Sequence, residues 1–395
     1  MGNRQSRRWV ASALTAGLVF GLAGCGAASA TGPAAPAFLD AAQATKIVGA
    51  VYPLNPPPGP ATDSPTGWAP ATYIDSGPPL LFVDHEAIPG PGLLARTQVN
   101  GSIRLFSYLV SVDPTPLSFA WVLENQGTRS VKVTVTNHAA AAPGEDYLPL
   151  AASVQKAFLQ GTKAESFRIA PGAIHVLQDA STVPSPANAL ATSIYDLETT
   201  GTLEVESLGT TDLGSLTAHN LPMTYAGGGG KSALYPHDQR QLTVTFTGAR
   251  AVADIAGNQT DDPGMLAPDL NTGVSDRDLA NFGVTYQVHI VFPAGPSRTS
   301  DLWVTARGCS LRADLKMESG PLADHVVQLP AVGTLPVGPL GTALAPLGIP
   351  AGVQSVFSFT FLPPSGACTP FVVREDPVNP DAPQVQLYQT AVWRS

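Results

Sequence analysis

Residues 131–136 have the sequence VKVTVT, in which valine alternates with a polar residue. This period of two predicts a strand with one buried and one solvated face. The preceding segment, 117–123, is richer in apolar residues, and the connection between the two contains Asn125 and Gly127. Because Asn and Gly suit turns that need positive φ, we expect the two segments to pair as a β-hairpin.

Short apolar runs bounded by Gly, Pro and Asp recur along the rest of the chain, a pattern typical of β-sandwiches. The segment 148–160 differs, because its apolar residues recur at helical spacing and Gly161 stands where a helix would end. We therefore predict a mainly β protein with two β-sandwich-like domains and one amphipathic helix near 148–160, in the first domain. The further predicted strands are 80–83, 102–110, 166–169, 174–177, 202–206, 242–247, 284–292, 302–306, 326–329, 353–362 and 385–393.

The chain divides by composition into four parts. Residues 1–24 are predicted to be an export signal, and residues 25–70 a tether rich in Ala, Pro, Gly and Thr, a composition that favours an extended chain. The two sandwiches are expected at 71–210 and 211–395, since the stretch around 207–239 is rich in Gly, Ser and Thr. A single two-sheet domain with a long excursion is the alternative.

The apolar run near the N-terminus ends in Leu22-Ala23-Gly24-Cys25, after three arginines among the first eight residues. This pattern resembles the signal of bacterial lipoproteins. The resemblance implies cleavage before Cys25 and a diacylglycerol on its sulfur, and two acyl chains suffice for stable membrane attachment. A transmembrane anchor is the alternative, but it needs about 20 consecutive apolar residues and this run is shorter. Ser6-Arg7-Arg8 also resembles a twin-arginine signal, so the export route stays open.

The expected mature chain is acidic. Loss of residues 1–24 removes three of the 21 basic residues and no acid, which leaves 18 basic against 30 acidic residues and a formal charge of −12. An acidic surface repels phosphate backbones, and the chain has no basic stripe, so we expect no nucleic-acid partner. Charged residues make up only 13% of the chain, against about 25% in typical soluble proteins. Uncharged polar residues, Gly and Pro must therefore cover much of the surface.

Cys309 and Cys368 are the other two cysteines. In an oxidising compartment we expect them to form a disulfide. It would close a loop of roughly 60 residues and stabilise the fold by about 4 kcal/mol if chain entropy dominates. No C-x-x-C spacing supports redox chemistry, and two isolated cysteines make no closed zinc site.

No segment carries a specific metal or cofactor motif, and we predict no metal site and no cofactor. Residues 225–232, YAGGGGKS, resemble a phosphate-binding loop but begin with Tyr225 where glycine is required, which favours a flexible loop. The acid-rich stretch 261–278 contains Asp269 as a first EF-hand position. That count puts Ala280 where the bidentate Glu belongs, which favours a solvated loop over a calcium site.

Histidines and paired acids carry little catalytic signal. The seven histidines show no metal-binding spacing, and no Gly-x-Ser-x-Gly elbow is present. Glu204 and Glu206 would share one face of a strand, and Glu145 and Asp146 are neighbours, so either pair could supply the two carboxylates of a glycoside hydrolase. Such pairs are common by chance. We therefore assign no catalytic residue and expect a non-catalytic protein.

A set of short motifs spans roughly residues 80–295: Asp84-His85, Pro91-Gly92-Leu93-Leu94, Gly101, Arg104-Leu105, Val122-Leu123-Glu124-Asn125, Pro143, Asp146-Tyr147-Leu148, Val154-Gln155, Ile194-Tyr195-Asp196 and Asn281-Phe282-Gly283-Val284-Thr285-Tyr286. Together they resemble an uncharacterised secreted β-rich region of Gram-positive cell-wall-associated proteins, often found beside copper-amine-oxidase-like N-terminal (stalk) domains. The resemblance implies an extracytoplasmic location and a β architecture, and it implies no activity. The chain lacks the stalk repeat itself, which argues against a copper site.

An anchor, an extended spacer and a polar-surfaced body together suit a protein that presents a rigid surface away from a membrane. We therefore predict a lipid-anchored structural or binding module on the extracytoplasmic face of the cell membrane, with a cell-wall polymer or an envelope protein as partner. The alternatives are a hydrolase that acts on a wall polymer and a solute-binding lipoprotein, although solute receptors alternate strands and helices. A cleft with paired acids within about 10 Å, lined by Trp121 or Trp303, would favour the hydrolase.

Overall fold

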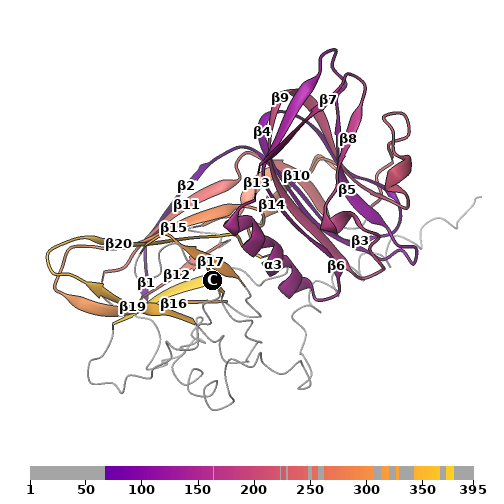
Figure 1. Cartoon of the computed structure of the whole chain (residues 1–395). Coiled ribbons are helices and arrows are strands. Elements are labelled where there is room, and N and C mark those ends of the chain that lie inside the picture. The colour runs from indigo at the N-terminus through magenta and orange to yellow at the C-terminus, as the bar shows by residue number, and fades with distance from the viewer. Residues whose placement is uncertain are drawn as a thin grey trace, which may run out of the picture.

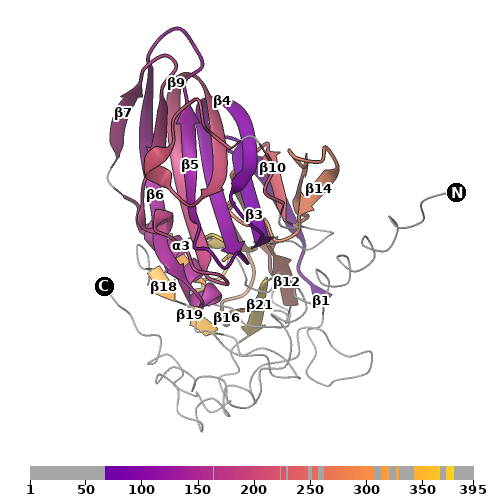
Figure 2. The same ribbon diagram turned by 90° about the vertical axis from the view of Figure 1, so that its right-hand side faces the viewer.

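The computed structural model describes residues 67–162, 164–222, 224–227, 230–247, 251–256, 262–306, 313–319, 326–328, 342–364 and 371–377. Strands dominate these residues, and the one α-helix among them is α3 (Tyr147–Gln160), so the predicted mainly β fold with an amphipathic helix is confirmed (Figures 1 and 2). Within the same residues, no helix has both the length and the apolar character needed to cross a bilayer.

The first β body is an eight-stranded sheet that folds back on itself. Its path is β10-β3-β4-β9-β5-β8, with β6 and β7 branching from β9. The long strands β4 and β9 both contribute to one apolar core from their two ends, for example through Leu94 and Leu105 of β4. A register shift beside Gly101, whose φ is +86°, accompanies this fold in the sheet. The strands are β3 (Leu80–Ile88), β4 (Gly92–Ser111), β5 (Ser118–Glu124), β6 (Val131–Gly144), β7 (Glu165–Ile169), β8 (Ile174–Leu177), β9 (Leu190–Thr210) and β10 (Lys231–Tyr235).

The hairpin expected between 117–123 and 131–136 is wrong. β5 pairs with the C-terminal half of β9, and β6 pairs with its N-terminal half, so the connection crosses from one layer to the other. Asn125 shapes this connection, because its Nδ2 donates to the backbone oxygens of Arg129 (2.8 Å) and Ile169 (2.9 Å). Gly127 has no positive φ, and its N–H donates to the Asn125 side chain instead. Pairing with the long β9 satisfies backbone N–H and C=O groups of both strands, which a local hairpin between β5 and β6 would not do.

The second β body consists of a six-stranded and a five-stranded sheet, ordered β18-β17-β20-β15-β11-β2 and β1-β12-β21-β16-β19. Apolar side chains of both sheets, such as Phe359 of β20 and Phe371 of β21, share one core, as in a sandwich. The strands are β1 (Gly67–Trp68), β2 (Ala71–Ser76), β11 (Gln239–Thr245), β12 (Ala251–Ile255), β15 (Thr285–Phe292), β16 (Arg298–Ala306), β17 (Asp314–Met317), β18 (Val326–Gln328), β19 (Thr342–Ile349), β20 (Ser355–Phe361) and β21 (Phe371–Pro377); a separate ribbon pairs β13 (Met265–Pro268) with β14 (Ser275–Asp278).

The two bodies are joined by more than the chain. β2 precedes β3 in the sequence but pairs with β11 of the second body, whereas β10 lies beyond residue 210 and pairs with β3 of the first body. Phe82 of β3 and Phe106 of β4, in the first body, belong to the same apolar core as Phe361 of the second body. The predicted division into domains at 71–210 and 211–395 stays a prediction, and strands are exchanged across it.

Helix α3 lies at the junction of the two bodies (Figure 1). As the sequence predicted, the helix ends before Gly161. The φ of this residue, +79°, suits glycine, and its N–H donates to the oxygen of Phe158. Gln155 of the helix is buried and donates to the oxygen of Pro363 at 2.8 Å. The ring of Phe158 lies 4.9 Å from the guanidinium carbon of Arg104. The helix therefore closes the junction rather than covering only the first body.

Several predicted features lie outside the described residues. These are the signal and tether up to residue 66, the lipidation residue Cys25, both cysteines of the predicted disulfide, Cys309 and Cys368, and the strand 385–393. They stay predictions.

Candidate functional site

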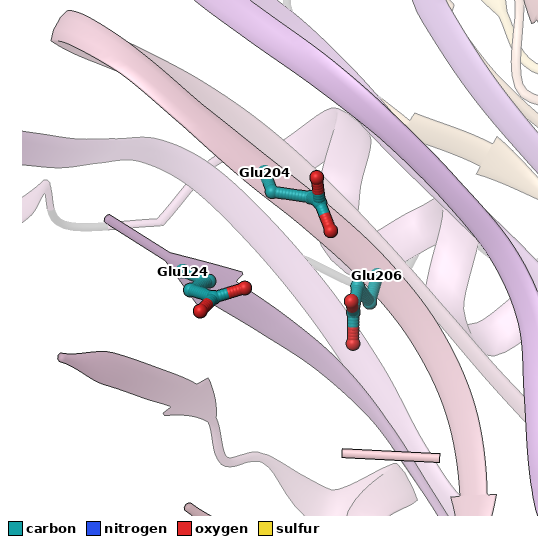
Figure 3. Close-up of side chains that lie close together, drawn as sticks. All are labelled: Glu124, Glu204 and Glu206. Carbon is teal, nitrogen blue, oxygen red and sulfur yellow. The ribbon is translucent and has the colours of Figure 1, made fainter. Parts of the chain in front are cut away.

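Three glutamates converge on the outer face of the first body, on the layer formed by β5, β8 and parts of β4 and β9. Glu124 of β5 is the cross-strand partner of Glu204 of β9, and Glu206 follows two residues later on the same face. Arg96 of β4 is the cross-strand partner of Glu206. One carboxylate oxygen from each glutamate lies within 4.8 Å of the others (Figure 3). We call these three residues the glutamate cluster.

Burial increases across the glutamate cluster. The Glu206 side chain is 0% exposed, the Glu204 side chain 12%, and Glu124 is partly exposed. Val122 is the cross-strand partner of Glu206, and it belongs with Leu208 to a small buried apolar cluster. Desolvation raises the pKa of Glu206 to about 7, even though Arg96 pulls it down.

Arg96 is the cation that balances part of this charge. Its Nε lies 2.6 Å from Oε1 of Glu206 and 2.9 Å from Oε1 of Glu204, and its Nη2 also contacts Glu206. Glu124 Oε2 accepts a hydrogen bond from Gln126 at 2.9 Å. Oε2 of Glu206 is buried and has no hydrogen-bond partner in the described part of the chain.

The sequence pointed to part of this arrangement. It placed Glu204 and Glu206 on one face of a strand, which the structure shows. It missed Glu124, because the expected hairpin hid the pairing of β5 with β9, and no local signal joins residues 80 positions apart. The other candidate pair, Glu145 and Asp146, lies outside the glutamate cluster, before α3.

The glutamate cluster does not match the cleft that would favour a hydrolase. Glu206 has no exposed surface, and the pocket beside the cluster is lined by none of the three glutamates. Trp121 is buried in the core of the first body, where its Nε1 donates to Ser193 Oγ at 3.3 Å. The side chain of Trp303 lies outside the described residues.

A surface groove of about 500 Å³ opens next to this face. It lies where β7 and β8, the ends of two branches of the sheet, leave the first body open. Glu165 and Gln178 are exposed in it, and His138 and His175 are partly exposed. The remaining lining is Ile174, Val176, Leu177, Tyr195 and Leu216.

Ring contacts hold the groove's imidazoles in place. His138 stacks on Tyr195 with ring centroids 5.5 Å apart, and His175 stacks on Phe167 at 3.7 Å. The Tyr195 hydroxyl donates to Asp179 at 2.5 Å, which fixes the ring on the groove floor. Desolvation lowers the pKa of His175, so its imidazole is neutral near pH 7 and can both donate and accept a hydrogen bond.

A buried serine and histidine elsewhere in the first body resemble a nucleophilic pair but are structural. His85 Nε2 lies 2.9 Å from Ser232 Oγ, and that hydroxyl donates to the oxygen of Leu94 at 2.8 Å. The Ser232 hydroxyl donates its proton to the oxygen of Leu94, so His85 Nε2 must donate to that hydroxyl. The imidazole therefore cannot act as a base that deprotonates Ser232. Both side chains are fully buried, and burial lowers the pKa of His85 to about 4.

The described aspartates of the acid-rich stretch 261–278 bind other groups of the protein. Asp269 accepts from the backbone N–H groups of Asn271, Thr272 and Ser232, and these hydrogen bonds lower its pKa despite the opposing effect of burial. Asp262 pairs with Arg240. Lys231, the lysine of the glycine-rich loop, begins β10 and pairs with Asp276 at 3.1 Å, so it does not mark a phosphate site.

A comparison of the chain with protein-family models and with curated proteins finds no match.

Proposed function

We propose that this protein is a lipid-anchored, non-catalytic binding module on the extracytoplasmic face of a bacterial cell membrane, and that its ligand is a cell-wall polymer. The signal-like N-terminus ending in Cys25 supports the location. The resemblance of residues 80–295 to a region of wall-associated proteins supports the ligand class. The binding site is the groove between β7 and β8.

The lining of the groove is the observation that carries the proposal. Sugar rings combine apolar faces with many hydroxyl groups. A site that binds them therefore needs both apolar side chains and hydrogen-bonding groups. Val176 and Leu216 offer apolar contact, whereas Glu165, Gln178 and His175 offer hydrogen-bond donors and acceptors. Rings fixed by stacking lose little side-chain entropy when a ligand binds.

The test is a co-sedimentation of the chain from Gly26 to Ser395 with purified wall polymer. Retention that falls at least tenfold in Glu165→Ala and Gln178→Ala supports the groove as the site. The matched control is Glu198→Ala, an exposed glutamate on β9 outside the groove, which is expected to bind as the unsubstituted chain does.

Three results would count against the proposal. Absence of retention would exclude the wall polymer as ligand, and unchanged retention in both groove variants would exclude the groove. Release of sugar or peptide fragments into the supernatant would instead support the hydrolase.

A further inference from the structure

We propose that the glutamate cluster binds a hard divalent cation such as calcium, held by one oxygen each from Glu124, Glu204 and Glu206. The site lies on the outer face of the first body, beside the groove, and Glu124 is the cross-strand partner of the groove residue Ile174, but none of the three glutamates lines the groove. It therefore stands or falls independently of polymer binding.

The spacing of the oxygens fits one ion. Calcium takes oxygen ligands at about 2.3–2.6 Å, so two ligands of the same ion are at most about 5 Å apart. One oxygen from each of the three glutamates meets this limit, since all lie within 4.8 Å of one another. The three side chains stand on the same face of adjacent strands (Figure 3). The strands need not move for an ion to be held between them.

A second observation points to a missing partner. The Glu206 side chain is completely buried, and while Arg96 holds its Oε1, its Oε2 has no hydrogen-bond donor among the residues that the structure describes. A buried carboxylate oxygen without a partner is costly and rare in native proteins. A cation among the three carboxylates would supply the interaction that this oxygen lacks.

The charge of the site also suits a divalent ion. When all three carboxylates are ionised, as they would be around a bound ion, they and the Arg96 guanidinium carry a net charge of −2 within a small volume. A divalent cation neutralises this charge, and a monovalent one does not. Because Glu124 and Glu204 are partly exposed, an ion can enter from solvent, and water can complete its six to eight oxygen ligands.

The competing account is a shared proton. Glu206 would then be protonated and would donate a hydrogen bond to a neighbouring carboxylate, as close acid pairs do. This account needs no metal, and it predicts that calcium leaves the protein unchanged. A direct titration with calcium therefore separates the two.

The experiment is isothermal titration calorimetry of the chelator-treated full chain with calcium chloride, and in parallel with magnesium chloride. We expect one ion per chain and an increase in melting temperature with calcium, because an ion that binds only the folded state stabilises it. Glu124→Gln and Glu204→Gln each keep the shape of the side chain and remove its charge, and each is expected to weaken binding at least tenfold. Glu198→Gln, on the same strand as Glu204 and outside the cluster, is the matched control and is expected to bind normally.

Circular dichroism of each variant shows whether it folds, and the partly exposed Glu124 provides a variant that leaves the buried contacts untouched. The proposal is overturned if neither heat nor a melting shift appears at about 10 mM calcium, well above the roughly 1 mM dissociation constants of weak extracellular calcium modules. It is also overturned if Glu198→Gln weakens binding as much as Glu204→Gln does. Binding of magnesium at the same site, lost in the same variants, would support the hard-cation class.

Discussion

Single arginines hold the buried charges of this protein together. Arg104 of β4 forms a fork with Asp196 at 2.7 and 3.0 Å, and it also pairs with the buried Asp238 at 3.1 Å. Its Nη1 donates to the oxygens of Asp238 and Gly283 and to the hydroxyl of Thr285. One side chain thus connects β4 and β9 of the first body to β15 of the second.

Replacing Arg104 should therefore be severe. Arg104→Met leaves Asp238 buried without its cation and several oxygens without donors, and we expect a loss of about 3–5 kcal/mol in the free energy of unfolding. Arg104→Lys should recover only part of this loss, because an ammonium cannot reproduce the guanidinium fork. Urea denaturation measures both values.

The control for this prediction is Arg168→Met, at an exposed position of β7, for which a change within about 0.5 kcal/mol is expected. A loss for Arg104→Met no larger than that of the control would show that the buried arginine is not a structural connection.

In the proposed function, the lipid on Cys25 holds the protein at the membrane. Cys25→Ala should abolish incorporation of labelled fatty acid and should move the chain from the membrane pellet to the soluble fraction, because no acyl chain then holds it. Fractionation of cells that express each form provides the measurement. Membrane retention of the Cys25→Ala chain would argue for a different anchor.

At the scale of elements, pairing with distant strands overrides local preference. β6 continues through Asn137 and a run of alanines to Gly144, residues that seldom form strands, because it pairs with β9 throughout. The edge strand β2 was not predicted, because its sequence ATYIDS lacks alternation and several of its side chains are exposed. The helix α3 was predicted well, since its apolar spacing and the glycine that follows it are local signals.

The predicted disulfide joins two cysteines that are far apart in the sequence. Cys309 and Cys368 both lie outside the described residues, so the bond stays a prediction from the sequence.

Reduction should then reveal the bond. We expect no free thiol from Cys309 or Cys368 in the exported, denatured chain, and a reductant should lower the unfolding free energy by about 4 kcal/mol through the roughly 60-residue loop it opens. Thiol titration and denaturation with and without dithiothreitol provide the measurements. Two reactive thiols in the exported chain would contradict the prediction.

At the scale of the whole molecule, buried acids make stability depend on pH. Desolvation, aided by the nearby Glu86, raises the pKa of the half-buried Asp84 to about 8, and desolvation raises the pKa of the buried Asp278 to about 7, from an ordinary value of 3.8. Between about pH 4 and pH 8 the folded state therefore binds more protons than the unfolded state, so stability falls as pH rises. His85, with its lowered pKa of about 4, acts in the opposite direction only below about pH 6.5.

The net effect is clearest above that value. We expect the melting temperature to fall between pH 6.5 and pH 8, and Asp84→Asn to reduce this fall, because a neutral amide needs no proton to be buried. Glu198→Gln should leave the slope unchanged. A melting temperature that stays level or rises over this range would contradict the assignment of protonated buried acids.

The sequence by itself determined the β class, the one helix and the face shared by Glu204 and Glu206, because alternation, helical spacing and strand periodicity are local properties. It also carries the signal-like N-terminus on which the proposed location depends. Only the tertiary structure decided that β5 and β6 separate onto two halves of β9, that Glu124 joins the glutamate cluster, and that β7 and β8 leave a groove. These features depend on pairings between residues far apart in the chain, whose energy comes from hydrogen bonds and burial that no short segment encodes.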